Sequence, residues 1–184
     1  MTRTKLAVLS LAALPVFHTV LTQGMEAPKP AKEMEQLAAF DGTWTCTGNA
    51  PAGPLGPAHA TRSTAKFHKD LGGMWLSGTI AESASKENPQ AFEGMAHMTY
   101  DAAGKGFVLL WVDNMGAWST ETSPGWQGDT MVWTGEGSLN GMKVGSRDTF
   151  TKKGADLHHV GEVQMDGKWV TLQDELCKGS AAKK

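Results

Sequence analysis

The spacing of apolar residues along the chain changes its period once, near residue 42. Between Ala31 and Phe40 apolar side chains recur at helical spacing with charged residues on the other side, which predicts one short amphipathic helix. From Gly42 to Gly48 apolar and polar positions alternate and threonine is frequent, which is typical of a β-strand. We therefore expect a helix first and β-structure after it.

Nine further segments carry the strand pattern, and short turn sequences separate them. They are residues 59–71, 74–83, 91–101, 105–114, 117–123, 130–139, 142–152, 156–166 and 168–178. The strongest turn signal is Asn140-Gly141, because a type I′ hairpin turn requires positive φ at both central residues. With the first strand, the sequence predicts about ten antiparallel strands joined by hairpins.

Ten strands joined by hairpins fold either into a sandwich or into an up-and-down barrel. The barrel is favoured because every connection is short enough to join neighbouring strands. A barrel also places the first strand beside the last, and the two cysteines, Cys46 and Cys177, lie in those two strands. A disulfide between them would tie the closure, and two separate buried thiols are the alternative. The predicted fold class is an all-β, up-and-down barrel with one short amino-terminal helix.

Residues 1–24 have the layout of a secretory signal peptide. A short basic start precedes an apolar run over residues 6–17, and small residues follow at the expected cleavage site. The apolar run is shorter than the roughly 20 residues that span a bilayer, and an uncleaved anchor is the alternative. We expect an exported protein, periplasmic or extracellular. Its predicted parts are the signal peptide, a linker over residues 25–32, one barrel domain over residues 33–178 and a tail over residues 179–184.

Composition agrees with a turn-rich β protein and argues against nucleic-acid binding. The 184 residues include 22 Gly, 8 Pro and 7 Trp, and the formal net charge is −2. Glycine at this level interrupts long helices, and a nucleic-acid-binding surface needs an excess of basic side chains. We expect no nucleic-acid partner and, once the signal is removed, no stable insertion into a membrane.

An ordered set of motifs resembles a known superfamily. The segment from Leu37 to Trp44, a short helix that runs into Gly-x-Trp, is similar to the opening of the lipocalin and calycin superfamily. Within that superfamily the chain resembles a family of secreted bacterial proteins of unknown function over residues 33–177. The further motifs that carry this likeness are Gly72-Gly-Met-Trp75, Phe92-Glu-Gly94 and Trp111-Val-Asp113 with Gly116. The resemblance implies a β-barrel with an interior ligand cavity, and it implies no known activity.

The chain departs from the superfamily at one contact. Many of these barrels place an Arg from late in the chain over the Gly-x-Trp tryptophan, which is Trp44 here, and the last strand of this chain has no Arg. Either Lys178 or Arg147 takes that place, or the contact is absent.

Tryptophan supplies the largest apolar side chains that could line a cavity. Core packing is the simplest explanation for any single Trp, and Trp44 is interpreted as structural. Several Trp around the volume that a barrel encloses would instead form an aromatic pocket. The residues predicted to bind a ligand are Trp75, Met98, Trp111, Trp118, Trp133, His97, Arg147 and His159.

Histidine is the residue type that could bring a cofactor into the barrel. An inward His159 or His97 could serve as the axial ligand of a haem iron. Met95, His97 and Met98 could suggest a soft metal, but His97 and Met98 point to opposite faces of a strand. Met as core filler and a hydrogen-bonded His are therefore the favoured interpretation. We expect no metal and, apart from the haem alternative, no cofactor.

The acids carry no catalytic signature. The sequence has no nucleophile-elbow motif, phosphate loop or dinucleotide fingerprint. A buried acid or Arg147 could orient the polar head group of a ligand. The favoured function is binding of a small apolar or aromatic molecule in the lumen, without implied catalysis. The rival functions are an enzyme that uses a lumen His or carboxylate as acid or base, and a haem-binding barrel.

The predicted strand from Lys105 to Asp113 is apolar on both faces. Phe107, Leu109 and Trp111 share one face, and the intervening valines and leucine share the other. A simple barrel strand exposes a polar outer face. We therefore expect the amino-terminal helix, or a partner subunit in a homodimer, to cover one face of this strand.

Overall fold

The computed structural model describes residues 27–180, apart from residues 54–55 and 87–88. The predicted signal peptide lies outside the described residues, and so do residues 181–184 of the predicted tail. In the described part, no helix is long and apolar enough to cross a membrane.

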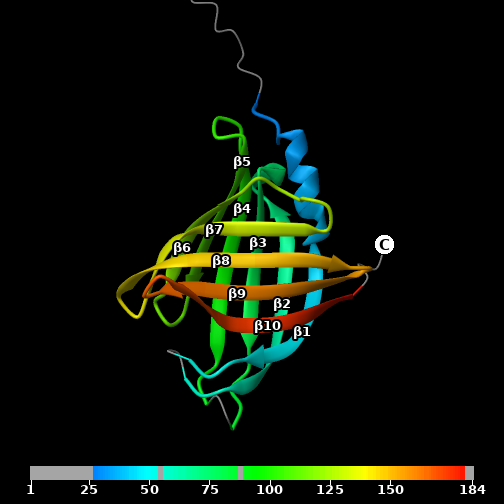
Figure 1. Cartoon of the computed structure of the whole chain (residues 1–184). Coiled ribbons are helices and arrows are strands. Elements are labelled where there is room, and N and C mark those ends of the chain that lie inside the picture. Colours follow the sequence, from blue (N-terminus) through cyan, green and yellow to red (C-terminus); the bar gives the residue numbers. More distant parts are fainter. Residues whose placement is uncertain (1–26, 54–55, 87–88, 181–184) are drawn as a thin grey trace, which may run out of the picture.

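Ten strands form one closed antiparallel barrel in which each strand pairs with the next along the chain, and the last pairs with the first (Figure 1). Two short 3-10 helices, η1 (Lys32–Ala39) and η2 (Leu71–Gly73), accompany them. The strands are β1 (Gly42–Ala50), β2 (His59–Asp70), β3 (Trp75–Glu82), β4 (Phe92–Asp101), β5 (Gly106–Asp113), β6 (Trp118–Ser123), β7 (Thr130–Leu139), β8 (Met142–Lys153), β9 (Asp156–Met165) and β10 (Lys168–Ser180). The predicted fold class is confirmed.

The hairpin turns have the backbone geometry that their sequences require. Asn140 and Gly141 have φ values of 50° and 76°, and they connect β7 to β8. Asp166 and Gly167 have φ values of 50° and 74° and connect β9 to β10 in the same way. Positive φ at both central residues matches the twist of the two flanking strands, so these turns set the register of both hairpins.

The barrel closes where β1 meets β10, and a disulfide joins the two strands. Cys46 and Cys177 are direct partners in the register, and their Cα atoms are 3.9 Å apart. Both side chains are buried and point inward. The disulfide predicted from the positions of the two cysteines is therefore confirmed, because the barrel brings residues 131 positions apart in sequence into contact.

The predicted helix forms as η1 and lies at one end of the barrel (Figure 1). Leu37 and Phe40 belong to the buried core that fills this end. The Trp44 Nε1–H donates to the carbonyl oxygen of Phe40 at 2.7 Å, and the Trp126 Nε1–H donates to the carbonyl oxygen of Gln36 at 2.9 Å. Two indole groups therefore hold the helix against the barrel and close this end.

The Arg contact expected over Trp44 is absent, and a glycine lies there instead. Gly179 is the register partner of Trp44, and a Cβ atom at Gly179 would be 3.0 Å from the indole ring. The Arg147 guanidinium lies 4.2 Å above the centre of the Trp169 ring, away from Trp44. Lys178 pairs with Thr45 and is exposed. Neither basic residue substitutes for the superfamily Arg.

The outer face of β5 is apolar, and η1 does not cover it. Of the two covers predicted from the sequence, the helix is therefore wrong, and the partner subunit stays a prediction. Leu110 and Val112 are 38% and 47% exposed. Val112 lies between Met95 of β4 and Trp118 of β6 in the register, and both of these are also exposed. The helix closes the end of the barrel, so this outer stripe remains on the surface.

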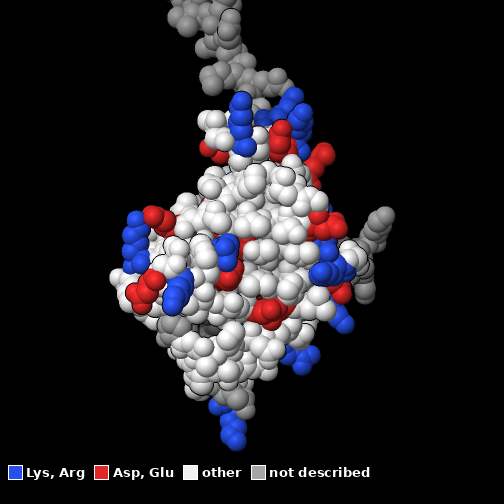
Figure 2. Space-filling model, viewed as in Figure 1, with Lys and Arg blue, Asp and Glu red and all other residues white. Residues whose placement is uncertain are grey.

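Charged side chains of both signs are interspersed on the face shown in Figure 2, with wide uncharged areas between them. One ion pair on the outer wall joins Arg147 Nε to Glu162 Oε2 at 2.7 Å, and another joins Lys143 to Glu136 at 2.6 Å.

The disulfide is expected to contribute strongly to stability because it closes a loop of most of the barrel. Replacing both Cys46 and Cys177 by Ser should lower the free energy of unfolding by about 2 to 5 kcal/mol. Urea unfolding monitored by tryptophan fluorescence measures this difference. A reducing agent should shift the wild-type midpoint and leave that of the double variant unchanged. Equal midpoints for the oxidised wild type and the double variant would contradict this role.

Candidate functional site

The barrel encloses a cavity of about 340 Å³. Its lining extends from Phe40 and Phe67, near η1, to Pro51, Met115 and Asn140 in the loops at the opposite end of the strands. Since η1 closes one end, these loops surround the mouth. The volume lies at the lower end of the range of roughly 300 to 1,000 Å³ that is usual for small-molecule sites.

Glycines in the wall let aromatic rings lie flat against the strands. The Trp111 ring occupies the space over Gly94, and the Phe67 ring occupies the space over Gly78. Phe92 stacks on Trp111, with ring centroids 6.1 Å apart. A side chain at either glycine would push its ring toward the lumen. The aromatic rings therefore line the cavity without filling it.

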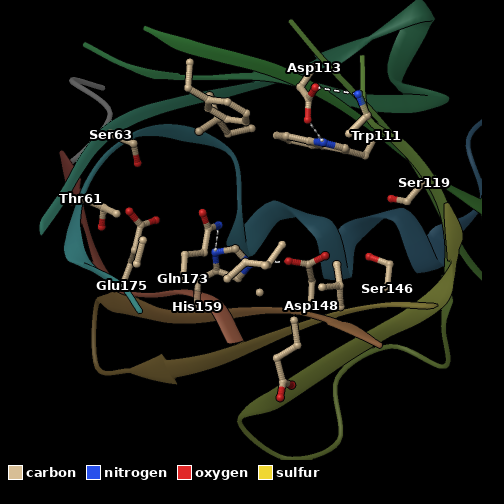
Figure 3. Close-up of a pocket in the computed structure, with 18 of the residues that line it drawn as sticks. Thr61, Ser63, Trp111, Asp113, Ser119, Ser146, Asp148, His159, Gln173 and Glu175 are labelled. Atoms are coloured by element: carbon tan, nitrogen blue, oxygen red, sulfur yellow. Dashed lines mark hydrogen bonds and ion pairs between the residues drawn. The ribbon is translucent and has the colours of Figure 1, made fainter. Parts of the chain in front are cut away.

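A first polar group in the lumen is centred on His159 of β9 (Figure 3). Its Nε2 lies 2.6 Å from Asp148 Oδ1, and its Nδ1 lies 3.2 Å from the Gln173 amide. Phe150 stacks on the imidazole with ring centroids 4.3 Å apart. Asp148 and Gln173 reach the ring past Gly161, where a Cβ atom would lie within 3.3 Å of both side chains. The imidazole is held on both edges and on one face.

Three carboxyl groups around His159 decide its charge. Burial alone would lower the pKa of His159, but the hydrogen bond and charge of Asp148 raise it, and the charges of Glu175 and Glu121 add to the rise. The net effect is a pKa above the ordinary value. The imidazolium form is thus favoured relative to a free histidine.

Glu121 of β6 is a buried carboxyl group beside this cluster. Its Oε1 accepts hydrogen bonds from Ser119 Oγ at 2.8 Å and from Ser146 Oγ at 2.7 Å. Its Oε2 has no hydrogen-bond partner among the described residues. Burial and the Asp148 charge raise the pKa of Glu121 to about 7, and the two serine hydroxyl groups oppose this rise. Near neutral pH the carboxyl group is therefore protonated in a large fraction of molecules.

A second polar group adjoins the first where β2, β1 and β10 are adjacent, and its Glu175 is the register partner of His159 (Figure 3). Thr61 and Ser63 of β2 and Glu175 of β10 are buried, with 6%, 5% and 5% exposure. Gly48 of β1 is the register partner of both Thr61 and Glu175, so no β1 side chain stands between these two. The Thr61 and Ser63 hydroxyl oxygens lack a partner within the described chain.

The Glu175 carboxylate and the two cysteine sulfurs lie within 4.8 Å of one another. The sulfurs are bonded to each other. A disulfide sulfur is not the thiolate that binds a metal ion, so in the oxidised protein this group offers one carboxylate and no thiolate ligand.

The structure places four of the eight predicted ligand-binding residues at the cavity. Met98, Trp111 and His159 line its interior, and Trp118, on the outer face at the start of β6, borders its mouth and is 51% exposed. Trp133 is fully buried in the core and packs edge-on against Phe107, outside the cavity lining. Contact with a ligand stays a prediction for Met98, Trp111, Trp118 and His159.

Trp75, His97 and Arg147 lie at strand positions that point away from the lumen, and none of them lines it. The His97 Nδ1 lies 2.9 Å from Ser77 Oγ, and Arg147 pairs with Glu162. His97 is thus hydrogen-bonded outside the cavity, as the simpler interpretation of that histidine expects.

Neither histidine suggested for haem presents an open ring nitrogen to the lumen. His97 lies outside the cavity lining. Both ring nitrogens of His159 have hydrogen-bond partners, and Phe150 covers one face of the ring. An axial bond from His159 would require the loss of one of these contacts.

Sequence reasoning did not single out the second polar group or the partners of His159. For Glu175, however, the sequence did contain a signal. Cys177 must point inward if it pairs with Cys46 across the closure, and strand alternation then turns Glu175 inward as well. The β-bulge between Thr171 and Gln173 shifts the register, so simple alternation does not extend to Gln173.

Comparisons with known proteins identify a family and a fold. A model of DUF1579, described as a protein family of unknown function, matches residues 29–174. The structure is also similar to the crystal structure of Rv2717c from M. tuberculosis, with a TM-score of 0.65 and 13% sequence identity. That alignment covers 83% of this chain and 99% of the other. At this identity the likeness shows the fold alone. No curated protein matches the sequence.

Glu121 is expected to make stability depend on pH. With a folded-state pKa of about 7 against 4.5, its contribution is complete below the lower value and is lost as the pH rises through the higher one. Glu121→Gln should therefore reduce the loss of unfolding free energy between about pH 5 and about pH 8 by on the order of 1 to 3 kcal/mol. Thermal unfolding across this range measures the difference.

The surface variant Glu136→Gln is the matched control, because Glu136 is exposed and its ion-pair partner, Lys143, is exposed as well. The pH dependence from His159 is the same in the wild type and Glu136→Gln. Because the Glu121 charge raises the pKa of His159, its removal in Glu121→Gln reduces the pH dependence in the same direction. Parallel pH profiles for the wild type and Glu121→Gln would contradict the assignment.

Proposed function

We propose that this chain, which belongs to DUF1579, a family of proteins of unknown function, is an exported binding protein. It holds a small apolar or aromatic molecule inside the barrel. The observation that carries the proposal is a cavity of about 340 Å³ whose wall is formed by flat aromatic rings. Convergent polar groups in such an apolar cavity set the orientation of a ligand.

The size of the cavity sets the scale of the ligand and of its affinity. A volume at the low end of the usual range suits a molecule of one or two rings. Burying about 200 Å² of apolar surface would contribute about 5 kcal/mol. After the costs of association, affinities in the micromolar to millimolar range follow from apolar contact alone.

Export is the part of the proposal that the disulfide supports. A structural disulfide between distant residues is typical of proteins that fold in an oxidising compartment. Together with the sequence pattern of residues 1–24, this favours the periplasm or the extracellular space.

An acid–base enzyme is the second candidate, and one observation favours it. Glu121 has a pKa of about 7, and it adjoins the Asp148–His159 pair. A general base needs a free lone pair toward its substrate, whereas both nitrogens of His159 are engaged and Glu121 is nearly inaccessible. Binding without turnover is therefore the better-supported function. Mass spectrometry of a bound ligand after long incubation separates the two, because an enzyme would change its mass or composition.

Filling the lumen should weaken binding. Ala96 lines the cavity and is buried, so Ala96→Phe adds a ring inside the barrel. The affinity for the neutral fluorescent probe N-phenyl-1-naphthylamine should fall by at least about tenfold. The control is Met95→Phe, on the same strand with an outward, exposed side chain. Equal probe affinity for both variants, with circular dichroism showing intact folds, would exclude the lumen as the binding site.

We also propose that the uncovered stripe of Met95, Val112 and Trp118 forms the contact of a homodimer. These residues are adjacent in the register and exposed, which supports burial against a second copy. Light scattering coupled to size-exclusion chromatography should give the mass of a dimer for the signal-free protein, and Val112→Lys should give a monomer. A wild-type monomer at high protein concentration would overturn the homodimer.

A further inference from the structure

We propose that the lumen recognises a molecule with a primary ammonium group, which binds to Glu175, Thr61 and Ser63 while its apolar part lies against the aromatic wall. This inference rests on the proposed function, because it specifies the chemical class of the lumen ligand. The site lies where β2, β1 and β10 are adjacent, next to the Asp148–His159 pair, because Glu175 is the register partner of His159 (Figure 3).

The first argument is the charge of the cavity wall. Among the described residues that line the cavity there is no Lys and no Arg, and the basic side chains there are His59 and His159. The carboxyl groups that face the lumen are Glu82, Asp113, Asp148 and Glu175, and Glu162 adjoins the cavity from the outer wall, where it pairs with Arg147. An excess of negative charge at low dielectric attracts a cation and opposes the entry of an anionic ligand.

Glu175 differs from the other lining acids in its hydrogen bonds and ion pairs. Glu162 pairs with Arg147, and Asp148 pairs with His159. Asp113 accepts a hydrogen bond from the Trp111 indole, and Glu82 accepts one from a backbone amide. The Glu175 side chain forms no hydrogen bond or ion pair within the described chain, although it is only 5% exposed. Its basic neighbour is His159, its register partner in β9, whose ring nitrogens already face Asp148 and Gln173. A buried carboxylate in this situation is stabilised by a bound donor.

The third argument is the set of acceptors beside Glu175. The hydroxyl oxygens of Thr61 and Ser63 are fully buried and have no hydrogen-bond partner in the part of the chain that the structure describes, and both residues line the same cavity. A primary ammonium group carries three N–H donors. One carboxylate and two hydroxyl oxygens match those donors in number, and a charged donor forms stronger hydrogen bonds than a neutral one. The Cys46–Cys177 disulfide lies next to this site, and its sulfurs carry no hydrogen-bond donor that could compete with the ammonium group.

The aromatic wall adds a contribution that depends on the same charge. Trp111, Phe67 and Phe92 present rings to the cavity. The faces of aromatic rings attract cations and also bury apolar carbon. A molecule with an aromatic or alkyl body and one amine therefore matches both the polar group around Glu175 and the aromatic wall.

Four ligands with the same carbon body test the inference on the wild-type protein by isothermal titration calorimetry. They are 4-phenylbutylamine, 4-phenylbutan-1-ol, 4-phenylbutanoate and 4-phenylbutyl-trimethylammonium. The amine should bind roughly 10- to 100-fold more tightly than the alcohol, because it makes charge-assisted hydrogen bonds. The carboxylate should bind most weakly. The trimethylammonium ligand should bind more weakly than the amine, because it has the charge but no N–H donor.

Glu175→Gln should remove the preference for the amine over the alcohol while the affinity for the alcohol changes less than threefold. The matched control is Asp174→Asn, because Asp174 is the adjacent residue, pairs with His158 outside the lumen and loses the same charge. Thr61→Val, which keeps the shape of the side chain, should weaken the amine more than the alcohol.

The outcomes separate the inference from the function on which it rests. If the alcohol or the carboxylate binds as tightly as the amine, the ammonium site is excluded and the lumen remains a binding site for apolar molecules. If Glu175→Gln and Asp174→Asn reduce the amine preference equally, the preference comes from overall charge and the assigned site is wrong. If none of the four ligands binds, both the proposed function and the inference fail.

Discussion

The pairing of β1 with β10 is the constraint on which the rest of the structure depends. Once these two strands pair with Cys46 opposite Cys177, the sheet has no free edge, and its inner face becomes a lumen. The inward direction of the two sulfurs also sets the phase of both strands. Glu175 and, across β1, Thr61 and Ser63 follow onto the same inner face. The closure and the polar site therefore have one structural cause.

The lumen stays open because its large rings lie against glycines. Gly94 and Gly78 give room to Trp111 and Phe67, and Gly179 gives room to Trp44 near the closed end. Glycine weakens a strand and leaves no side chain to pack, so this wall has a cost in stability that the disulfide and the buried end beneath η1 offset. The two polar groups then differ in kind. Asp148, His159 and Gln173 contact one another, whereas the Thr61 and Ser63 hydroxyl oxygens beside Glu175 have no hydrogen-bond partner among the described residues.

The sequence predicted the barrel well because local signals agreed with one another. Period-two alternation, the Asn140-Gly141 turn and the positions of the two cysteines each pointed to the same topology, and the strand limits differ from the predicted ones by a few residues at most. Individual site residues were harder to predict, because alternation shows which residues share a face but not which face is inner. His97 and Arg147 were chosen by residue type, and both lie outside the lumen. Thr61 and Ser63 carry no signal of their own, and their importance depends on neighbours in β1 and β10 that are distant in sequence.

A hollow barrel, an aromatic wall and one buried carboxylate without a hydrogen bond in the described chain together form a site for an apolar molecule with a cationic head. A crystal structure of the protein grown with 4-phenylbutylamine tests this most directly. The account predicts the ligand inside the barrel, its nitrogen within about 3 Å of a Glu175 carboxylate oxygen, and its ring against Trp111 or Phe67. A lumen filled by the protein's own side chains, or a ligand with its nitrogen turned toward the mouth and away from Glu175, would contradict it.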